Sequence, residues 1–407
     1  MDFLVCQEPG PRRPYVPNRR DMQMRFSIFH GTGAPGRLDD YHQVMDEARE
    51  FAVAADRAGF WSVWYTEHHF GHEGQELTPN PVLMGADIAA RTSRIRIGQA
   101  AGIVTFWHPL RLAEDLALLD QLSGGRVEVG VGRGLYGREA LNLNPAADPR
   151  DQQRNRALFQ ETLDVLKAAW TGEFFAHQGE FFQFPAPGVA WNHPLSPPSP
   201  EFMTDGTITK MKVVPRPLQR ELPLWQVIDS PTSIEWAAAN GVKGIFWLPP
   251  VSALKGRFEL YRDTASTAAG REVPLGEGIG LVRDVYVADT MEQARADFEE
   301  AVMNTYRWVC HWRGLSNLME EGEALTDAHE LSFDFLHGRN QLVGTPEFVA
   351  EKIAELRDEL NLQDLLLWTT HPGLDHRKAM RSLELFTDKV MPQFADAPGA
   401  GAAGARR

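Results

Sequence analysis

The sequence predicts an α/β protein whose eight parallel strands close into a TIM (β/α)8 barrel. Short apolar runs alternate with amphipathic segments, and eight such pairs can be counted between residues 24 and 395. This alternation is typical of a parallel sheet with its helices outside. Polar residues also follow most of the apolar runs, as they do at the carboxyl end of a barrel. A doubly wound open sheet is the alternative, but the count of eight units favours closure.

The composition is that of an ordinary globular protein. The 407 residues are 43% hydrophobic and 24% charged, and the net charge of −14 argues against a nucleic-acid partner. Two cysteines exclude a disulfide framework. No segment has the roughly 20 apolar residues of a membrane helix, and the N-terminus lacks the order of a signal peptide. These features predict a cytoplasmic protein with no membrane partner.

Local signals delimit the first four strand–helix units. Apolar residues at helical spacing (Val44, Ala48, Phe51, Ala55) predict a helix, and Gly59 follows it where a terminating glycine is favoured. The expected strands in this half span 24–30, 61–66, 94–104 and 126–132. The expected helices span 41–58, 81–91, 109–122 and 154–170.

Two insertions interrupt the second half. The first, at about 172–222, contains FFAHQGEFFQFP, which predicts a hairpin turning at His177-Gln178-Gly179, and then a proline-rich surface loop. The second covers about 314–343, after the seventh helix. The remaining strands are expected at 223–228, 244–248, 277–288 and 364–370. One further helix is expected to end at residue 239. The other helices are expected to span 252–269, 291–312, 345–360 and 376–390.

The two ends of the chain differ from the middle. Prolines and arginines are frequent in residues 1–23, and small residues fill 396–407. We therefore expect a poorly ordered extension, a single barrel domain over 24–395, and a flexible tail.

A histidine cluster follows the second expected strand. Glu67, His68 and His69 combine proton carriers with a carboxylate that can orient them, which predicts catalysis or contact with a cofactor. A metal site would need three or four converging ligands. The further ligands would come from other strand ends, at His30, His108 and His371. Metal-dependent barrel hydrolases usually carry an H-x-H pair on the first strand, which is absent here, so we expect no metal. A structural role for the histidines is the third possibility.

Two other strand ends favour an anion. Asp229-Ser230-Pro231-Thr232-Ser233 begins the fifth helix, where hydroxyls and free N–H groups attract phosphate, although ordinary capping explains the same residues. Arg133 lies among glycines that allow close approach to phosphate, although a tight turn is an equal explanation. Arg156 is able to reach the same phosphate or is simply solvated.

Small and aromatic residues complete the expected mouth of the barrel. Ala100 and Ala101 leave room for a flat ring, or else mark a closely packed core position. The aromatic residues near the strand ends would form an apolar wall that shields a reaction from water. Its expected members are Phe70, Phe106, Trp107 and Trp247, and the expected substrate pocket contains Phe70, Trp107 and His108.

Six segments carry a resemblance to a known family. They are TEHHF (66–70), GQAAGIV followed by HP (98–109), RLAEDLALLDQLSGGRVEVGVGRGLY (111–136), QRNRAL (153–158), DSPTSIEWAA (229–238) and VGTPE (343–347). In this order they resemble the bacterial luciferase-like family of flavin-dependent monooxygenases, and they are most similar to the luciferase α-type subunit.

The resemblance implies a TIM barrel that binds reduced FMN at the strand ends. Oxygen would add to the flavin as a peroxide, and the peroxide would oxygenate a small organic substrate by hydroxylation or by Baeyer–Villiger oxidation. By motif, His68 matches the catalytic histidine, flanked by Glu67 and His69, and Ala100-Ala101 matches a cis peptide beside the flavin. The matching phosphate contacts are Arg133, Arg156, Ser230 and Ser233, with Asp229 through its backbone. Tyr136 and Trp247 would lie near the ring or the substrate.

The resemblance also implies partners and leaves alternatives. A separate flavin reductase would supply the reduced FMN, with O2 as co-substrate, and a homodimer would form through helices 81–91 and 109–122. A deazaflavin-dependent oxidoreductase of the same fold is one alternative. A catalytically idle flavin-binding subunit is the other, and the presence of His68 argues against it.

Overall fold

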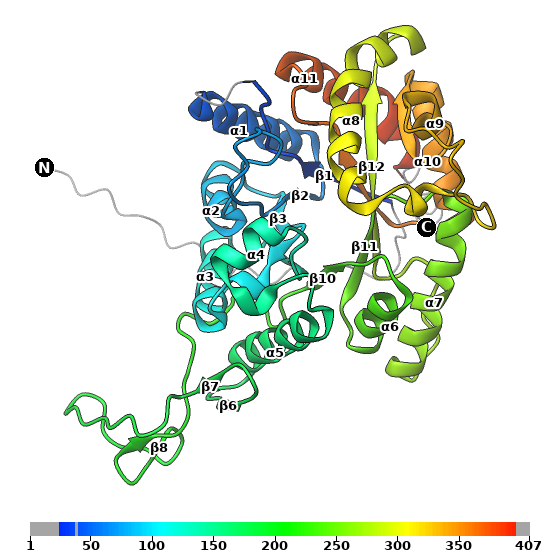
Figure 1. The fold of residues 1–407 in the computed structure, drawn as a ribbon. Helices are drawn as coiled ribbons and strands as arrows, with labels where there is room; N and C mark the ends of the chain where they lie inside the picture. The colour runs from blue at the N-terminus through cyan, green and yellow to red at the C-terminus, as the bar shows by residue number, and fades with distance from the viewer. Residues whose placement is uncertain (1–23, 37–39, 396–407) are drawn as a thin grey trace, which may run out of the picture.

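The computed structural model describes residues 24–36 and 40–395, so the expected extension (1–23) and tail (396–407) lie outside the described residues. Eight parallel strands form a barrel with helices around it (Figure 1). The barrel strands are β1 (Arg25–His30), β2 (Ser62–Tyr65), β3 (Arg96–Gln99), β5 (Val127–Gly132), β10 (Leu224–Val227), β11 (Lys243–Phe246), β12 (Ile279–Val287) and β14 (Asp364–Trp368).

The barrel closes because the two ends of the strand path pair with each other. Strand β10 pairs with β11 on one side and with β5 on the other, so the order β10-β11-β12-β14-β1-β2-β3-β5 returns to its start. The ladders are parallel, with Ile28 opposite Val63 and Leu224 opposite Val129. The predicted TIM barrel is confirmed, and the open sheet is excluded.

The helices bury the faces that their spacing predicted. Helix α1 (Tyr41–Ala58) buries Val44, Ala48, Phe51 and Ala55, and ends where Gly59 adopts a left-handed φ of 91°. The other helices are α2 (Pro81–Arg91), α3 (Pro109–Ser123), α4 (Gly137–Leu143), α5 (Gln152–Thr171), α6 (Pro231–Ala239), α7 (Val251–Ala269), α8 (Met291–Arg313), α9 (Phe333–His337), α10 (Pro346–Leu360) and α11 (His376–Leu385).

Three elements differ from the expectation. The third strand, expected over 94–104, is two strands, β3 and β4 (Gly102–Ile103), with the Ala100–Ala101 bond between them. Helix α4 lies between the fourth barrel strand and the helix expected next. At the end of the second insertion, β13 (Gln341–Gly344) extends the sheet beside the C-terminal half of β12. Each of these elements is too short to show a clear hydrophobic period.

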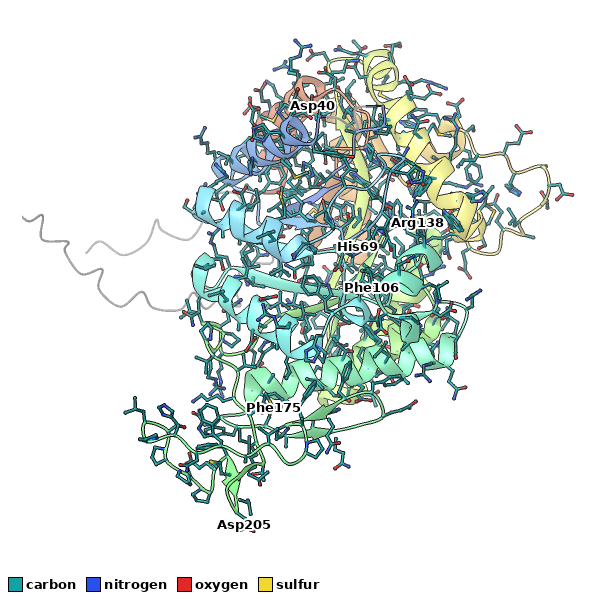
Figure 2. The ribbon with its side chains drawn as sticks, turned by 60° about the vertical axis from the view of Figure 1, so that its left-hand side comes forward. Asp40, His69, Phe106, Arg138, Phe175 and Asp205 are labelled. Carbon is teal, nitrogen blue, oxygen red and sulfur yellow. The ribbon has the colours of Figure 1, made fainter. Side chains whose placement is uncertain are left out.

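The first insertion forms an arm that projects from the barrel, with Asp205 at its tip (Figures 1 and 2). A hairpin of β6 (His177–Gln178) and β7 (Gln183–Phe184) begins it, so the predicted turn lies slightly too early. Glu161 on α5 anchors this hairpin by accepting backbone N–H groups from 180–182. The expected surface loop contains a second small hairpin of β8 (Met203–Thr204) and β9 (Thr207–Ile208).

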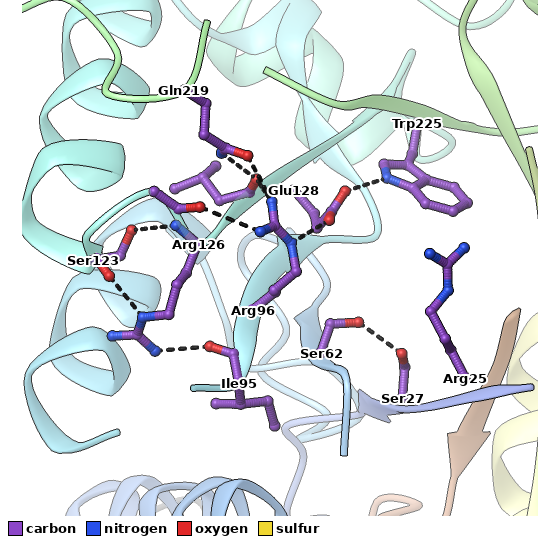
Figure 3. Close-up of polar contacts among 12 residues, drawn as sticks. Arg25, Ser27, Ser62, Ile95, Arg96, Ser123, Arg126, Glu128, Gln219 and Trp225 are labelled. Atoms are coloured by element: carbon purple, nitrogen blue, oxygen red, sulfur yellow. Dashed lines mark hydrogen bonds and ion pairs between the residues drawn. The ribbon is translucent and has the colours of Figure 1, made fainter. Parts of the chain in front are cut away.

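A buried polar network lies at the end of the barrel where the strands begin, opposite the end where they finish (Figure 3). Arg96 pairs with Glu128, and the other Glu128 oxygen accepts the indole N–H of Trp225 at 2.7 Å. The Ser62 hydroxyl donates to the Ser27 hydroxyl at 2.7 Å. Arg25, which Figure 3 draws without its partner, pairs with Asp364, so each polar side chain labelled there has a partner, as a stable polar core requires. Polar groups at this end stabilise the fold, and chemistry is expected at the other end.

No helix in the described part of the chain is both long and apolar enough to cross a membrane.

Candidate active site

Carboxylates lie against both ring nitrogens of His68, in the loop after β2. Nε2 is 2.9 Å from Glu76 Oε1, and Nδ1 is 3.2 Å from Glu139 Oε1. Because an ionised carboxylate only accepts hydrogen bonds, both ring nitrogens must donate, which only the charged imidazolium can do. Burial opposes this charge, but Glu76 and Glu139 together outweigh burial and raise the pKa of His68 to about 10. At neutral pH His68 is therefore a fixed cation.

Glu67 and His69 fasten the same loop to its neighbours. The buried Glu67 carboxylate accepts the backbone N–H of Ile103 at 2.7 Å and the indole N–H of Trp107 at 2.8 Å. His69 Nε2 lies 3.1 Å from Glu67 Oε1, and the backbone N–H of His69 donates to Glu139 at 2.7 Å. The three residues of the predicted cluster thus lie together. The side chains of Glu67 and His69 are used in hydrogen bonds within the protein.

The predicted phosphate residues meet in one small pocket of about 50 Å³. Arg133 and Arg156 line the pocket together with Ser230 and Ser233, which lie at the start of α6. Ser233 Oγ accepts the backbone N–H of Ser230 at 3.1 Å, and Ser230 Oγ accepts that of Ser233 at 3.3 Å. Capping of α6 is therefore present, and the pocket lies beside the capped end.

The pocket carries excess positive charge. Among the described residues neither Arg133 nor Arg156 forms an ion pair, and burial together with the charge of Arg156 lowers the pKa of Arg133. The side chain of Asp229 does not neutralise them, since it pairs with Arg313. Gln226 also lines the pocket, and its buried Oε1 has no hydrogen-bond partner in the described structure. Two arginines at a helix N-terminus suit a phosphate group.

Small residues lie where β4 and β5 run side by side. The Ala100–Ala101 peptide bond is cis, as the resemblance implied. A Cβ added at Gly132 on β5 would lie 3.0 Å from the Ala101 side chain. The chain around β4 and strand β5 therefore approach closely here, and the Ile103 side chain lies at nearly the same distance, 3.1 Å.

Two tryptophans at the carboxyl ends of β11 and β14, the strands on either side of β12, carry indole N–H donors that no described residue accepts. Trp247 follows β11 and Trp368 ends β14, and their ring centroids are 5.1 Å apart. Both indole N–H groups are buried and lack a partner in the described structure. A buried donor without a partner costs about 1–3 kcal/mol, so these groups are suited to a ligand at the barrel mouth.

A larger cavity of about 580 Å³ opens beside His68. The Tyr136 ring, whose centroid is 5.2 Å from that of His68, forms part of its wall. The cavity is bounded by the loop after β2, by the start of α4 and by one face of α8. Of the residues predicted from the sequence, Tyr136 alone is among those that line it.

Phe70, Trp107 and His108, the residues of the predicted substrate pocket, are not among those that line the cavity beside His68. Phe70 is 52% exposed and adopts a φ of 59°, and Trp107 donates to Glu67. Pro109 begins α3, so His108 occupies the N-cap position without a side-chain capping bond, and its ring centroid is 5.4 Å from that of Phe184 in the arm. Figure 2 shows His69 and Arg138 on the side of the barrel away from the tip of the arm.

His30 and His371, the other histidines considered as metal ligands, are separate from this site. Burial, and then the charge of His376, lowers the pKa of His30 to about 3. His371 Nε2 lies 2.9 Å from Asp284 Oδ1 in a fully buried pair. Within residues 24–36 and 40–395, no group of three or more His, Cys, Asp or Glu residues is placed to hold a metal ion.

Sequence reasoning missed both carboxylates at His68 and the wall formed by α8. Glu76 and Glu139 lie in a loop and in the short helix α4, where no pattern indicates a partner. Trp308 and Trp312, however, are four residues apart on a predicted helix and therefore share a face. That spacing was the one available signal.

Comparison with known proteins adds family and fold. The family model described as luciferase-like monooxygenase matches residues 24–361. The chain is 27% identical over 388 residues to the oxygenase component of the flavin-dependent trigonelline monooxygenase of Acinetobacter baylyi. The match covers 92% of this chain and 96% of that protein.

Solved structures agree with the barrel. Monooxygenase RslO1 from Streptomyces bottropensis superposes with a TM-score of 0.73 at 26% identity, covering 91% of this chain and 100% of that one. The oxygenating constituent of 3,6-diketocamphane monooxygenase from Pseudomonas putida, a type II Baeyer–Villiger monooxygenase in complex with FMN, has a TM-score of 0.73 at 24% identity and covers 91% and 99%. An F420-dependent secondary alcohol dehydrogenase shares the fold, with a TM-score of 0.63 at 16% identity, and covers 92% and 100%.

Proposed function

Because the chain belongs to the luciferase-like monooxygenase family, we propose that it uses reduced FMN and O2 to oxygenate a small organic substrate. The reaction is a hydroxylation or a Baeyer–Villiger oxidation. The relative in Acinetobacter is named an oxygenase component. We extend that organisation to this chain, with a separate reductase as the source of reduced FMN.

The observation that carries the proposal is the pocket formed by Arg133, Arg156, Ser230 and Ser233. It joins two arginines without ion-pair partners in the described structure to the N-terminus of α6, which is a suitable site for a dianionic phosphate. Its small volume, about 50 Å³, suits a phosphate group and not the whole cofactor. The phosphate of FMN would lie here, and the pocket would orient the rest of the cofactor toward the barrel mouth.

His68 supplies a second positive charge, toward the other end of the proposed cofactor site. Reduced FMN supplies the electrons that activate oxygen, and its ring is readily anionic. The His68 imidazolium, held by Glu76 and Glu139, keeps a proton at each ring nitrogen through neutral pH. A fixed cation stabilises nearby negative charge without having to reorganise.

Exclusion of water is the third task of this chain's residues. Trp247 and Trp368 cover the barrel mouth, and Tyr136 closes the side next to His68. Their apolar surfaces lower the local dielectric constant, which strengthens the charge interactions inside. The unpaired indole N–H groups remain available to a bound ring.

A deazaflavin cofactor is the second candidate, because an F420-dependent enzyme shares the fold and the phosphate pocket suits either cofactor. Such an enzyme would transfer hydride and would not consume O2. An idle flavin-binding subunit is a weaker candidate, since the pair of carboxylates that holds His68, Glu76 and Glu139, has no evident use in storage. We call this pair the clamp.

Equilibrium titration of the full chain with FMN, riboflavin and coenzyme F420 separates these candidates. We expect FMN to bind about tenfold tighter than riboflavin, or better, because only FMN carries the phosphate. Arg133→Gln should remove this preference, whereas Arg154→Gln, an exposed arginine on the same helix as Arg156, should retain it. Equal affinity for FMN and riboflavin would contradict the assignment, and tighter binding of F420 without oxygen consumption would favour the second candidate.

A further inference from the structure

We propose that the cavity beside His68 binds the substrate, and that this substrate is a planar aromatic molecule bearing a carboxylate. The ring would lie among Tyr136, Trp308 and Trp312, and the carboxylate would pair with Arg307. The inference rests on the proposed function, because it names the class of molecule that would be oxygenated there.

The aromatic wall is fixed in place by its own contacts. Trp308 Nε1 donates to the Tyr136 hydroxyl at 3.0 Å, which joins α8 to the start of α4. The Tyr136 ring lies 6.2 Å from that of Trp308 and 5.8 Å from that of Trp312, tilted by 71° and 58°. Because both tryptophan rings are inclined to the Tyr136 ring, the wall can offer a face and an edge to a flat guest, which is the arrangement that aromatic pairs prefer.

Trp312 leaves more than half of its surface exposed, which is unusual for a large apolar side chain. It is 56% exposed at the rim of the cavity, although it is among the largest apolar side chains of the protein. Its neighbours are Tyr136 on one side and His311 on the other, at a centroid distance of 5.1 Å. A guest in the cavity would cover this surface, and burial of an aromatic side chain is strongly favourable.

The charges around the cavity leave one cation in excess. Glu73 and Arg138 neutralise each other through a 2.7 Å pair at the cavity wall. Arg307 makes a hydrogen bond to Asn304 Oδ1 on its own helix, at 3.1 Å, and no ion pair within the described residues. A guanidinium presents two parallel N–H groups, so its natural complement is a planar carboxylate.

The cavity is joined to the proposed reaction site by shared elements. The loop that contributes Glu73 and Gln75 also carries Glu76, the partner of His68 Nε2. Helix α4 contributes Arg138 to the wall and Glu139 to His68 Nδ1. A ring held against Tyr136 would therefore lie close to His68, because the ring centroids of Tyr136 and His68 are 5.2 Å apart.

Size and polarity favour this class over a long aliphatic chain. The volume of about 580 Å³ is within the range of roughly 300–1,000 Å³ for small-molecule pockets, and it admits one or two fused rings. Glu73, Arg138, Arg307 and His311 make the rim polar. An alkyl chain would desolvate these groups without pairing them, which is costly.

Calorimetric titration of the full chain with 2-naphthoate, 2-naphthamide and decalin-2-carboxylate tests the proposal. We expect 2-naphthoate to bind about tenfold tighter than either analogue, since each lacks the charge or the aromatic ring. Arg307→Gln should weaken 2-naphthoate about tenfold and leave 2-naphthamide unchanged, and Arg307→Lys should recover part of the loss. Trp312→Leu should weaken both aromatic probes.

Arg295→Gln is the matched control, because Arg295 is exposed on the same helix and pairs with Glu299 and Asp334. It should leave all three affinities unchanged. Equal binding of acid and amide, or no effect of Arg307→Gln, would overturn the proposal. Because no flavin, reductant or oxygen is needed, this failure is distinct from failure of the FMN assignment, which the flavin titration measures separately.

Discussion

His68 owes its charge to two carboxylates that contact its ring but come from different parts of the chain. Glu76 follows it in the same loop, and Glu139 comes from α4, which follows β5 in the chain. Either carboxylate alone would orient the ring, whereas both together require the imidazolium. Sequence reasoning identified the histidine by its motif, but no local pattern shows which carboxylates will face its nitrogens.

Replacement of Glu76 by glutamine tests this clamp. The substitution keeps a hydrogen-bonding group and removes one negative charge, so the pKa of His68 should fall from about 10 by roughly 1–3. A titration of the histidine ring resonances by NMR measures the change. Glu355→Gln, at an exposed carboxylate on α10, should leave the value unaltered, and an unchanged value in the Glu76 variant would show that the clamp does not set the charge.

The clamp also predicts a pH dependence of stability. The folded pKa of about 10 exceeds the unfolded value of roughly 6.5. The stabilisation is therefore complete below about pH 6.5 and is lost as pH rises toward 10. Urea denaturation of wild type and His68→Gln should show a large stability difference at pH 6 and a small one at pH 10. A difference that is constant with pH would rule out a charge effect.

Among the secondary-structure elements, long periodic segments were predictable and short ones were not. Helix α1 and the apolar core of each barrel strand follow from spacing alone. Strands β4 and β13 and helix α4 have from two to seven residues, which is less than the period analysis needs. Because α4 carries Arg138 and Glu139, missing it also hid part of the site.

A glycine on β5 provides a sharp test of the packing between strands. A Cβ added at Gly130 would lie 1.6 Å from the backbone oxygen of Gln99, which cannot move without shifting β3. We expect Gly130→Ala to lower the free energy of unfolding by about 1–3 kcal/mol or more. Gly256→Ala, in α7 with nothing within 4 Å of the added Cβ, should instead raise it by about 0.5–1 kcal/mol. Chemical denaturation measures both, and a neutral Gly130→Ala would contradict the described register.

The whole molecule brings the ends of many strands to one mouth, and this explains which half of the site was predictable. Arg133, Ser230 and Ser233 follow barrel strands directly, so closure of the barrel places them near one another. The cavity wall on α8 depends instead on how one long helix lies across the mouth. Sequence patterns predict that the helix exists but not where it lies, so Arg307 and Trp308 were not identified.

Association is a prediction at the same scale. We propose that two copies pair through α2 and α3, whose outward faces expose Leu83, Leu118 and Leu122 by 69%, 45% and 63%. Exposed leucines on adjoining helices are typical of a subunit interface. Sedimentation should show a dimer for wild type and a monomer for Leu118→Glu/Leu122→Glu. Leu195→Glu, on the arm, should remain dimeric, and a monomeric wild type at micromolar concentration would remove the proposal.

If this barrel holds reduced FMN, it should control the reaction of that flavin with oxygen. Stopped-flow mixing of the protein and anaerobically reduced FMN with oxygenated buffer, following flavin absorbance, measures this control. We expect reoxidation to be slower than for free FMN, and we expect Arg133→Gln to abolish the difference because it releases the phosphate. Reoxidation of the wild-type mixture at the rate of free FMN would contradict this expectation.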